Sequence, residues 1–353
     1  MNDIQKQITA LRQGEIPTHA GWVQLITKAS QDDQLFSRDL ARQRAQARFG
    51  RQVFFRGIVE FTNYCKNDCY YCGIRRSNRC VSRYRLTEDE ILSCCEEGYA
   101  LGYRTFVLQG GEDVWWTDEK IAALVGKIRA AYPDCAITLS IGEKSREAYQ
   151  AFFDAGADRY LLRHETADAA HYAKLHPAAL SLSNRMRCLR DLKEIGYQTG
   201  AGMMIGAPYQ TPDTLAADFE FLAELKPEMV GMGPFIPHKD TPFRDLPAGS
   251  ATQTLYLLSL VRLLLPDVLL PATTALGTLD GTGRQAGVLS GCNVVMPNLS
   301  PMAVRKKYLL YDHKAGIEDS GETSLQKLRE QMQAIGYTVA VGRGDFTDGR
   351  TRT

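Results

Sequence analysis

The sequence has no excess of charge of either sign, no long apolar run and no segment typical of an export signal. Lysine and arginine number 42 against 41 acidic residues, so the formal net charge is +1. A chain so balanced sets up no long-range field, and we expect neither a nucleic acid nor an anionic membrane as its partner. No apolar run approaches the length of a membrane span, and the charged N-terminus lacks a small-residue cleavage site. These absences together predict a cytoplasmic protein.

Cysteine is present, but not in a pattern that suggests disulfide bonds. The nine cysteines are an odd number scattered along 353 residues, which indicates reduced thiols rather than a disulfide framework. The only CxxC pair is Cys69 and Cys72, and no cysteine follows Cys292. Cysteines that cluster in this chain are therefore expected to bind a metal or to carry out redox chemistry.

From about residue 51 to residue 300 the sequence alternates apolar strands with amphipathic helices, which is the pattern of βα units and a parallel sheet. Eight strands are expected, at residues 53–60, 105–109, 136–140, 159–163, 198–204, 229–234, 268–274 and 292–296. Eight units over about 250 residues are typical of a complete (β/α)8 TIM barrel, an α/β fold. An open doubly wound sheet is the alternative, because strand order cannot be read from sequence.

The two ends of the chain are expected to be extensions of this barrel. Residues 1–50 have helical periodicity and predict an N-terminal helical extension. Residues 301–353 are expected to form a C-terminal extension that packs on the barrel. No Pro/Ser-rich linker divides the chain, so we predict one barrel domain over residues 51–300.

Cys65, Cys69 and Cys72 follow the first predicted strand directly, in the βα loop at the C-terminal mouth where barrels carry their chemistry. Their CxxxCxxC spacing suits three corners of one [4Fe–4S] cubane and leaves the fourth iron without a protein ligand. An open iron can chelate S-adenosylmethionine (SAM), so that an electron delivered through the cluster yields a 5′-deoxyadenosyl radical. The spacing is the signature of radical SAM enzymes, and Tyr71 is placed to pack on the adenine.

Other interpretations of the three cysteines fit less well. A structural zinc takes four ligands, usually in CxxC pairs, and the chain has no second pair. A thioredoxin-like dithiol would leave Cys65 unused. The remaining cysteines are expected as small buried hydrophobes or, for Cys80, as a loop thiol.

Further polar groups follow other predicted strands and are candidates for binding SAM. Gly110 and Gly111 end the second strand, where their carbonyls could accept the ammonium group, and Glu112 follows them. After the fourth strand, Glu165 could hold ribose hydroxyls, and Arg185 could neutralise a carboxylate. Charged residues in a solvated loop are the simpler explanation of both, so position alone leaves the choice open.

Polar residues also occur within the predicted strands. These are Thr138, Arg159, Thr273 and Thr274, with Met296 at the end of the eighth strand. Hydroxyls and an arginine beneath a SAM site suit a small anionic or polar substrate, while a hydrogen-bonded polar layer of the core is the alternative.

Several motifs together resemble the HydE family of [FeFe]-hydrogenase maturases. They are CxxxCxxCG, QGGE, LLRHETA, YAKLHP, GAGMMIG, GPFIPHKDTP, PATTALGT, MPNLSP and RKKYLLY, between about residue 50 and residue 311. The HydE family groups with biotin synthase and methylornithine synthase among radical SAM barrels. The resemblance implies a complete barrel, SAM at the mouth, and a role in assembling the diiron part of the hydrogenase H-cluster.

The resemblance also implies roles for single residues. Those matching Arg163, Glu165 and Arg185 contact SAM in that family, and those matching Thr138, Arg159, Thr273 and Tyr308 line the inner cavity or anion sites. The implied substrate is a small organometallic iron precursor, with a reductant such as a ferredoxin or flavodoxin and other hydrogenase maturases as partners. Many family members carry three more cysteines for a second cluster; this chain has none beyond Cys292, and we predict one [4Fe–4S] cluster.

Two alternatives stay open from the sequence. The first is another radical SAM reaction, that of methylornithine synthase or that of biotin synthase, although biotin synthase needs a second cluster on cysteines inside the barrel. The second is a non-catalytic iron–sulfur carrier, which would not need Gly110, Gly111, Glu165 and Arg185 around a SAM-sized space.

Overall fold

The barrel sheet is the centre of the molecule. The computed structural model describes residues 1–317 and 321–347. Six parallel strands follow one another in a single sheet, in the order β2 (Gly57–Thr62), β3 (Thr105–Gly110), β4 (Ala136–Ser140), β5 (Arg159–Leu161), β6 (Gln198–Ala201) and β8 (Met229–Val230). Every neighbouring pair is parallel, as the alternation of strands and helices predicts.

Three further segments close this sheet into a ring. Met229 of β8 pairs with Leu269, and Pro271 pairs with Val294 of β10 (Val294–Val295). Strand β10 in turn pairs with β1 (Gln52–Phe55), which runs on into β2. Strand order therefore excludes the open doubly wound sheet, and the complete barrel predicted from the sequence is confirmed.

The seventh predicted strand, residues 268–274, makes only isolated bridges. Pro271 lies in its middle, and proline has no N–H to donate to a ladder. The fifth and sixth predicted strands are each interrupted, so β7 (Met204–Ile205) and β9 (Gly233–Pro234) form a separate pair. The first interruption is at Gly202, which has a φ of 147° and whose added Cβ would lie 2.0 Å from the carbonyl oxygen of Gly231.

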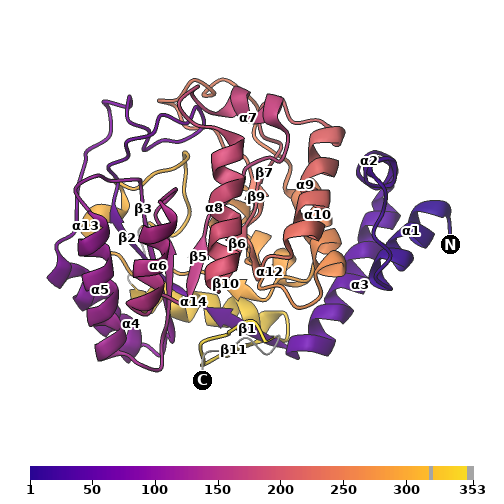
Figure 1. Cartoon of the computed structure of the whole chain (residues 1–353). Coiled ribbons are helices and arrows are strands. Elements are labelled where there is room, and N and C mark those ends of the chain that lie inside the picture. The colour runs from indigo at the N-terminus through magenta and orange to yellow at the C-terminus, as the bar shows by residue number, and fades with distance from the viewer. Residues whose placement is uncertain (318–320, 348–353) are drawn as a thin grey trace.

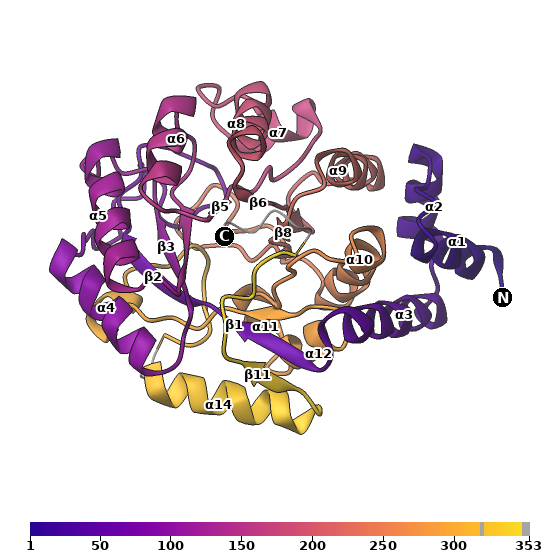
Figure 2. The same cartoon turned by 60° about the horizontal axis from the view of Figure 1, so that its bottom comes forward.

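Helices surround the ring on its outside, as Figure 2 shows in a view along the barrel. Their apolar faces pack inward: α4 buries Ile91, Cys94 and Cys95, and its N-terminus is closed by a capping box between Thr87 and Glu90. The helices after the first extension are α4 (Glu88–Ala100), α5 (Asp118–Ala131), α6 (Arg146–Asp154), α7 (Ala169–Leu175), α8 (Leu182–Ile195), α9 (Pro212–Leu225), α10 (Ala251–Leu264), α11 (Thr274–Leu279), α12 (Gly283–Val288), α13 (Met302–Arg305) and α14 (Gly321–Ala334).

The N-terminal residues form α1 (Asp3–Arg12), α2 (His19–Lys28) and α3 (Gln31–Phe49), which lie beside α9 and α10 (Figure 1). The indole of Trp22 stacks on Phe219 of α9 with ring centroids 4.6 Å apart. Ser37 of α3 hydrogen-bonds Ser259 of α10 at 2.7 Å between buried hydroxyls. No helix of the described residues is long and apolar enough to cross a membrane.

The last described residues close the N-terminal end of the barrel. Strand β11 (Thr338–Ala340) pairs in parallel with β1, and the chain then crosses this end of the ring (Figure 2). The ring of Phe346 packs against buried Met229, Leu269 and Val294. We call residues 343–346 the terminal plug, because they occupy the end of the barrel opposite the mouth.

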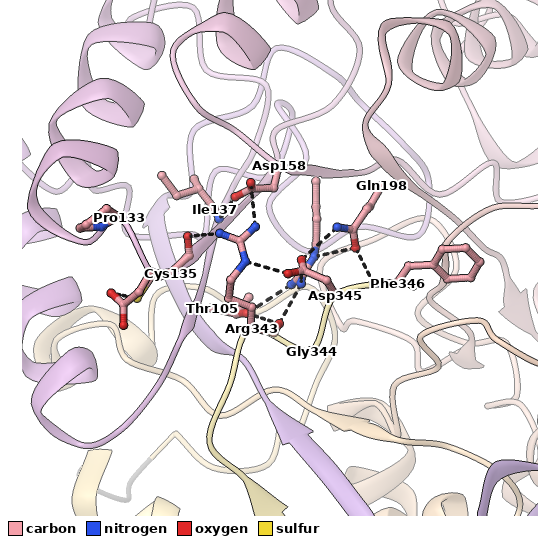
Figure 3. Close-up of polar contacts among 12 residues, drawn as sticks. Thr105, Pro133, Cys135, Ile137, Asp158, Gln198, Arg343, Gly344, Asp345 and Phe346 are labelled. Atoms are coloured by element: carbon pink, nitrogen blue, oxygen red, sulfur yellow. Dashed lines mark hydrogen bonds and ion pairs between the residues drawn. The ribbon is translucent and has the colours of Figure 1, made fainter. Parts of the chain in front are cut away.

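Arg159 lies in this plug region, inside the barrel at the first residue of β5. Its fully buried guanidinium donates to the carboxylate of Asp345 at 2.7 Å and to the backbone oxygen of Arg343 at 2.7 Å. Arg343 donates in turn to Asp345 at 2.7 Å and to Asp158 at 2.9 Å (Figure 3). The sequence placed Arg159 in the substrate cavity, and that role stays a prediction; its observed polar contacts include the plug.

Candidate active site

The loop that carries the three cysteines is held by one arginine. It leaves β2 at Thr62 and returns at Arg85, which forms an antiparallel bridge with Thr62. The guanidinium of Arg83 donates to the backbone oxygens of Ile74 at 2.8 Å and Asn78 at 3.1 Å, and also to those of Asn63 and Arg75. These bonds fold residues 63–83 back on themselves at the mouth, where Figure 1 shows the loop above the strands.

Cys65, Cys69 and Cys72 are free and partly buried thiols in this loop. Burial raises the pKa of Cys69 well above its ordinary value, and the nearby charges of Cys72 and Cys65 raise it further. A positively charged metal centre would stabilise three such thiolates together. In a cubane each thiolate binds a different iron. The residues therefore fit a [4Fe–4S] cluster.

Tyr71 lies between the cysteines and the predicted SAM residues. Its hydroxyl is 3.1 Å from the Nε2 of His176, whose ring stacks on Tyr172 with centroids 4.0 Å apart. Burial raises the pKa of Tyr71, and the charge of Glu165 raises it further, while that of Arg185 lowers it. Tyr71, Glu165, Arg185 and the cluster cysteines are thus electrostatic neighbours, so the structure brings together residues that are far apart in sequence.

Gly110 and Gly111 lie against the cysteine loop. A Cβ on Gly111 would stand 2.2 Å from the backbone oxygen of Tyr64 and 2.7 Å from the Cβ of Cys65, so only glycine lets the two loops meet. The next residue, Glu112, is buried and binds the Nζ of Lys66 at 3.1 Å and the backbone N–H of Glu143 at 3.0 Å. This turn therefore supports the cysteine loop as well as offering carbonyl groups to a ligand.

Arg163 and Glu165 form an ion pair at 2.9 Å on the mouth side of β5. The Nε of Arg163 has no partner within the described chain. Glu165 has a φ of 66°, a left-handed conformation that is uncommon for a residue with a Cβ. Its backbone N–H donates to the oxygen of Gly202 at 3.0 Å. Strain of this kind is held by the surrounding structure and is typical of binding sites.

His164 lies between these two residues in sequence and is fully buried on the other side of the chain. Its Nδ1 accepts the backbone N–H of Gly202 at 3.1 Å, and its Nε2 is 3.4 Å from the carboxylate of Asp218 on α9. Asp218 also accepts the backbone N–H of Ala167 at 2.6 Å. The pair anchors both ends of the strained turn, a role that sequence reasoning missed because a buried histidine has no local signal.

Arg185 of α8 is held at the mouth by an acid. Its Nε donates to Glu143 at 2.6 Å, and its NH1 donates to the backbone oxygen of Arg163. Glu143 also accepts from the side-chain amide of Asn184 at 2.6 Å. Sequence reasoning missed Glu143, although it follows the third predicted strand, where an acidic residue is a signal of a barrel site.

Below the mouth, the interior of the barrel contains polar side chains. The buried Oγ1 of Thr138 has no hydrogen-bond partner within the described chain. The hydroxyl of Tyr308 is 3.4 Å from the Nε2 of Gln109 on β3. An unpaired buried hydroxyl carries a desolvation cost unless a ligand or water satisfies it, so this interior suits a polar substrate.

Lys314 reaches the same interior from the C-terminal extension. Its Nζ donates to the carboxylate of Glu60 on β2 and, at 3.1 Å, to the backbone oxygen of Tyr308. Glu60 also accepts from the side-chain amide of Asn298 at 2.8 Å. Glu60 and Lys314 lie 254 positions apart in sequence, and no local pattern could have joined them.

The other predicted cavity residues lie at strand ends. Thr273 is the N-cap of α11, and its Oγ1 accepts the N–H of Leu276; Thr274 begins the helix. Met296 packs with the apolar layer of Met229, Leu269 and Val294. Their contact with a substrate stays a prediction.

Comparison with known proteins gives this site a family. A family model of the Radical SAM superfamily matches residues 59–222. The [FeFe] hydrogenase maturase subunit HydE of Thermotoga maritima is 44% identical over 287 residues, which are 81% of this chain and 82% of that protein. The 3-methylornithine synthase of Methanosarcina acetivorans is 27% identical over 286 residues, 80% of either protein.

Two solved structures share the fold. Methylornithine synthase (PylB) matches with a TM-score of 0.82 at 24% identity, covering 95% of this chain and 97% of that one. The [FeFe]-hydrogenase maturase HydG matches with a TM-score of 0.83 at 18% identity, covering 99% and 78%. Radical SAM enzymes use a [4Fe–4S] cluster and SAM, and Cys65, Cys69 and Cys72 fit the cluster motif. The chain is a radical SAM enzyme and belongs to the HydE family of [FeFe]-hydrogenase maturases.

Proposed function

We propose that this enzyme cleaves SAM reductively and acts in the cytoplasm to assemble the diiron subcluster of [FeFe] hydrogenase. The observation that carries the proposal is 44% identity to HydE of Thermotoga maritima over four-fifths of both chains. The reaction needs a small-molecule substrate, which we propose is an organometallic iron precursor, and a reductant. Nine free thiols are consistent with a reducing compartment.

Each part of the mouth has a role in this proposal. The three cysteines hold the cluster, and SAM bound to its open iron supplies a 5′-deoxyadenosyl radical upon one-electron reduction. Arg185 is fixed by Glu143 at 2.6 Å and neutralises a carboxylate of the ligand. Arg163 and Glu165 offer a guanidinium and a carboxylate to the polar groups of SAM. Tyr71 limits the space beside the adenine.

The substrate then occupies the barrel interior. Thr138 offers an unpaired hydroxyl, and Glu60 and Lys314 offer a carboxylate and an ammonium group. Charges of both signs in a buried space favour a polar or zwitterionic substrate over an apolar one.

Complementation tests the pathway. A host that makes [FeFe] hydrogenase but lacks its own HydE is expected to regain hydrogenase activity when it expresses this chain. The Cys69→Ala variant serves as the matched control and is expected to restore none. Normal expression without hydrogenase activity would refute the maturase role while leaving SAM cleavage open.

The chemistry is tested separately in vitro. Anaerobic reconstitution is expected to give about four irons per chain, and dithionite is then expected to convert SAM to 5′-deoxyadenosine. SAM that stays intact after reduction would contradict radical chemistry and favour an iron–sulfur carrier.

Methylornithine synthase is the second candidate, because the relative from Methanosarcina acetivorans covers four-fifths of the chain. Formation of 3-methylornithine in anaerobic incubations with amino acids, together with failed complementation, would favour it. Biotin synthase is less favoured, because it needs a second cluster held by cysteines inside the barrel, and none of the strands in the described part of the chain contains a cysteine.

A further inference from the structure

The cysteine loop is basic in a chain that is otherwise balanced. Between residues 66 and 85 the sequence has six lysines and arginines and one acid, against 42 and 41 in the whole chain. The one acid, Asp68, is bound by Arg75 at 2.7 Å. Arg76 and Arg79 are exposed, so positive charge gathers on the outer side of the loop that holds the cluster.

An exposed apolar pair lies beside this loop. Val114 is 76% exposed and Trp115 is 46% exposed, and they follow directly on the turn of Gly111, which packs against Cys65. Val114 is the most exposed large apolar residue among the described residues, and tryptophan is enriched at the centres of protein interfaces. Their place at the mouth, one loop away from a cluster ligand, therefore marks a surface for a partner.

Cations surround the exposed indole. The Nζ of Lys120 lies 3.5 Å from the centroid of Trp115, and the guanidinium of Arg85 lies 5.8 Å from it. Arg85 also lies 3.7 Å over the ring of Tyr64 and is fixed by Asp113 at 2.6 Å. The backbone N–H of Lys66 donates to the oxygen of Glu112 at 2.9 Å, which joins the basic loop to the turn that precedes Val114, and within the loop the N–H of Arg76 donates to the oxygen of Asn67 at 2.8 Å.

Three acids of this region are paired within the chain, which leaves Arg76, Arg79 and Lys120 as exposed cations and Glu119, beside Lys120, as an exposed acid. The pairs are Glu112 with Lys66, Asp113 with Arg85 and Asp118 with Lys144. An aromatic centre with a cationic rim fits a partner whose contact surface is acidic. We name Arg76, Arg85, Val114, Trp115 and Lys120 the docking face.

We propose that the docking face receives an acidic, low-potential electron-transfer protein and brings its redox centre to the cluster. The proposal rests on the proposed function, which needs one electron for every SAM cleaved. The electron leaves the partner's reduced centre and enters the cluster, with no bond formed or broken in the transfer. Complementary charge speeds the encounter and fixes the orientation.

The test uses reconstituted holoenzyme and reduced flavodoxin as the probe. The Arg76→Glu/Lys120→Glu double variant and the Trp115→Ala variant are expected to weaken flavodoxin binding at least tenfold in biosensor measurements. The rate at which flavodoxin bleaches the cluster absorbance is expected to fall equally, and for the wild type this rate should also fall with rising salt. Reduction by dithionite, a small reductant, is expected to stay unchanged. Lys28→Glu and Tyr209→Ala, which change exposed residues outside the docking face, serve as matched controls.

The proposal would be overturned if the docking-face variants bound flavodoxin and were reduced by it as well as the wild type is. It would also be overturned if the variants lost reduction by dithionite as much as reduction by flavodoxin. Both readouts are independent of SAM. If the holoenzyme failed to cleave SAM, the proposed function would be wrong. Flavodoxin binding and cluster reduction would still test the role of the docking face.

Discussion

At the N-terminal end of the barrel, Asp345 pairs with Arg159 and Arg343, and Arg343 also pairs with Asp158. Toward the mouth, the Nε of Arg163 lacks a partner within the described chain. Both regions are buried or nearly so, and a polar group hidden from water needs a partner. The plug supplies such partners from within the chain, whereas at the mouth we expect a bound ligand to supply the partner that Arg163 lacks.

Arg56, which is buried at the plug end, is an exception, because part of its guanidinium lacks a partner within the described chain. Its Nε has no partner within the described chain, and its nearest contacts are the sulfur of Met229 at 3.1 Å and the oxygen of Gly344 at 3.4 Å. Burial lowers the pKa of Arg56 well below its ordinary value, as does the charge of Arg159. Even so, the plug end as a whole is organised for stability, in keeping with the usual division of labour between the two ends of such barrels.

The largest effect is expected at the mouth. Replacing Cys69 with alanine removes one of three cluster ligands, and we expect iron content to fall from about four per chain to near zero, with complete loss of SAM cleavage. Iron analysis and 5′-deoxyadenosine measurement check this outcome. Cys80→Ser, which changes an exposed thiol of the same loop, should alter neither; a similar loss there would mean that the ligand set has been assigned wrongly.

A substitution at the plug end should lower the stability of the fold and leave SAM binding unchanged. Asp345→Ala leaves the buried guanidinium of Arg159 without its carboxylate, and we expect the free energy of unfolding to fall by about 3 kcal/mol. Urea unfolding measures this change. SAM affinity should stay within twofold of the wild type if the two ends act independently.

The matched control is Asp3→Ala, which breaks an exposed pair with Lys6 and should cost about 0.5 kcal/mol or less. A cost for Asp345→Ala as small as that of the control would contradict the role given to the plug.

Arg185→Ala is expected to act on binding. Its removal leaves Glu143 buried without its cation, and we expect SAM affinity to fall by about 2 kcal/mol, or roughly 30-fold. Equilibrium binding of SAM to the holoenzyme checks the value. Arg190→Ala removes another exposed arginine of the same helix and should leave the affinity unchanged. Equal losses in the two variants would indicate a general effect on α8 rather than a ligand contact.

The smallest effect is a pH dependence at the plug. Burial alone would raise the pKa of Asp345, but the charge of Arg159 and hydrogen bonds from Arg343 and Gln198 hold it below its ordinary value. Its ionised form therefore contributes stability above the unfolded pKa of about 3.9, and this contribution is lost as pH falls through the lowered folded pKa.

The difference in unfolding free energy between the wild type and Asp345→Asn should be constant above about pH 5 and shrink below about pH 4. Urea unfolding of cluster-free protein across this range measures it. A difference that grows on acidification would have the wrong sign for a carboxylate held in its charged form.

Much of the fold could be predicted, because its signals are local. The expected strand at residues 136–140 matches β4 (Ala136–Ser140), because its apolar residues and their neighbours can be read from a short stretch of sequence. The expected strand at residues 268–274 is reduced to isolated bridges. There the apolar run predicted a strand, but the missing N–H of Pro271 limited its ladder.

The cluster motif was settled by sequence alone, since Cys65, Cys69 and Cys72 belong to one short loop and their spacing is itself the geometric requirement. What only the tertiary structure decided are the partnerships between distant residues. Lys314 meets Glu60, Asp345 meets Arg159, and Asp218 supports His164 behind the strained turn. The sequence alone does not show which way a charged side chain points or which partner it meets. The physical reason is that burial, not proximity in the chain, determines which charges must find each other.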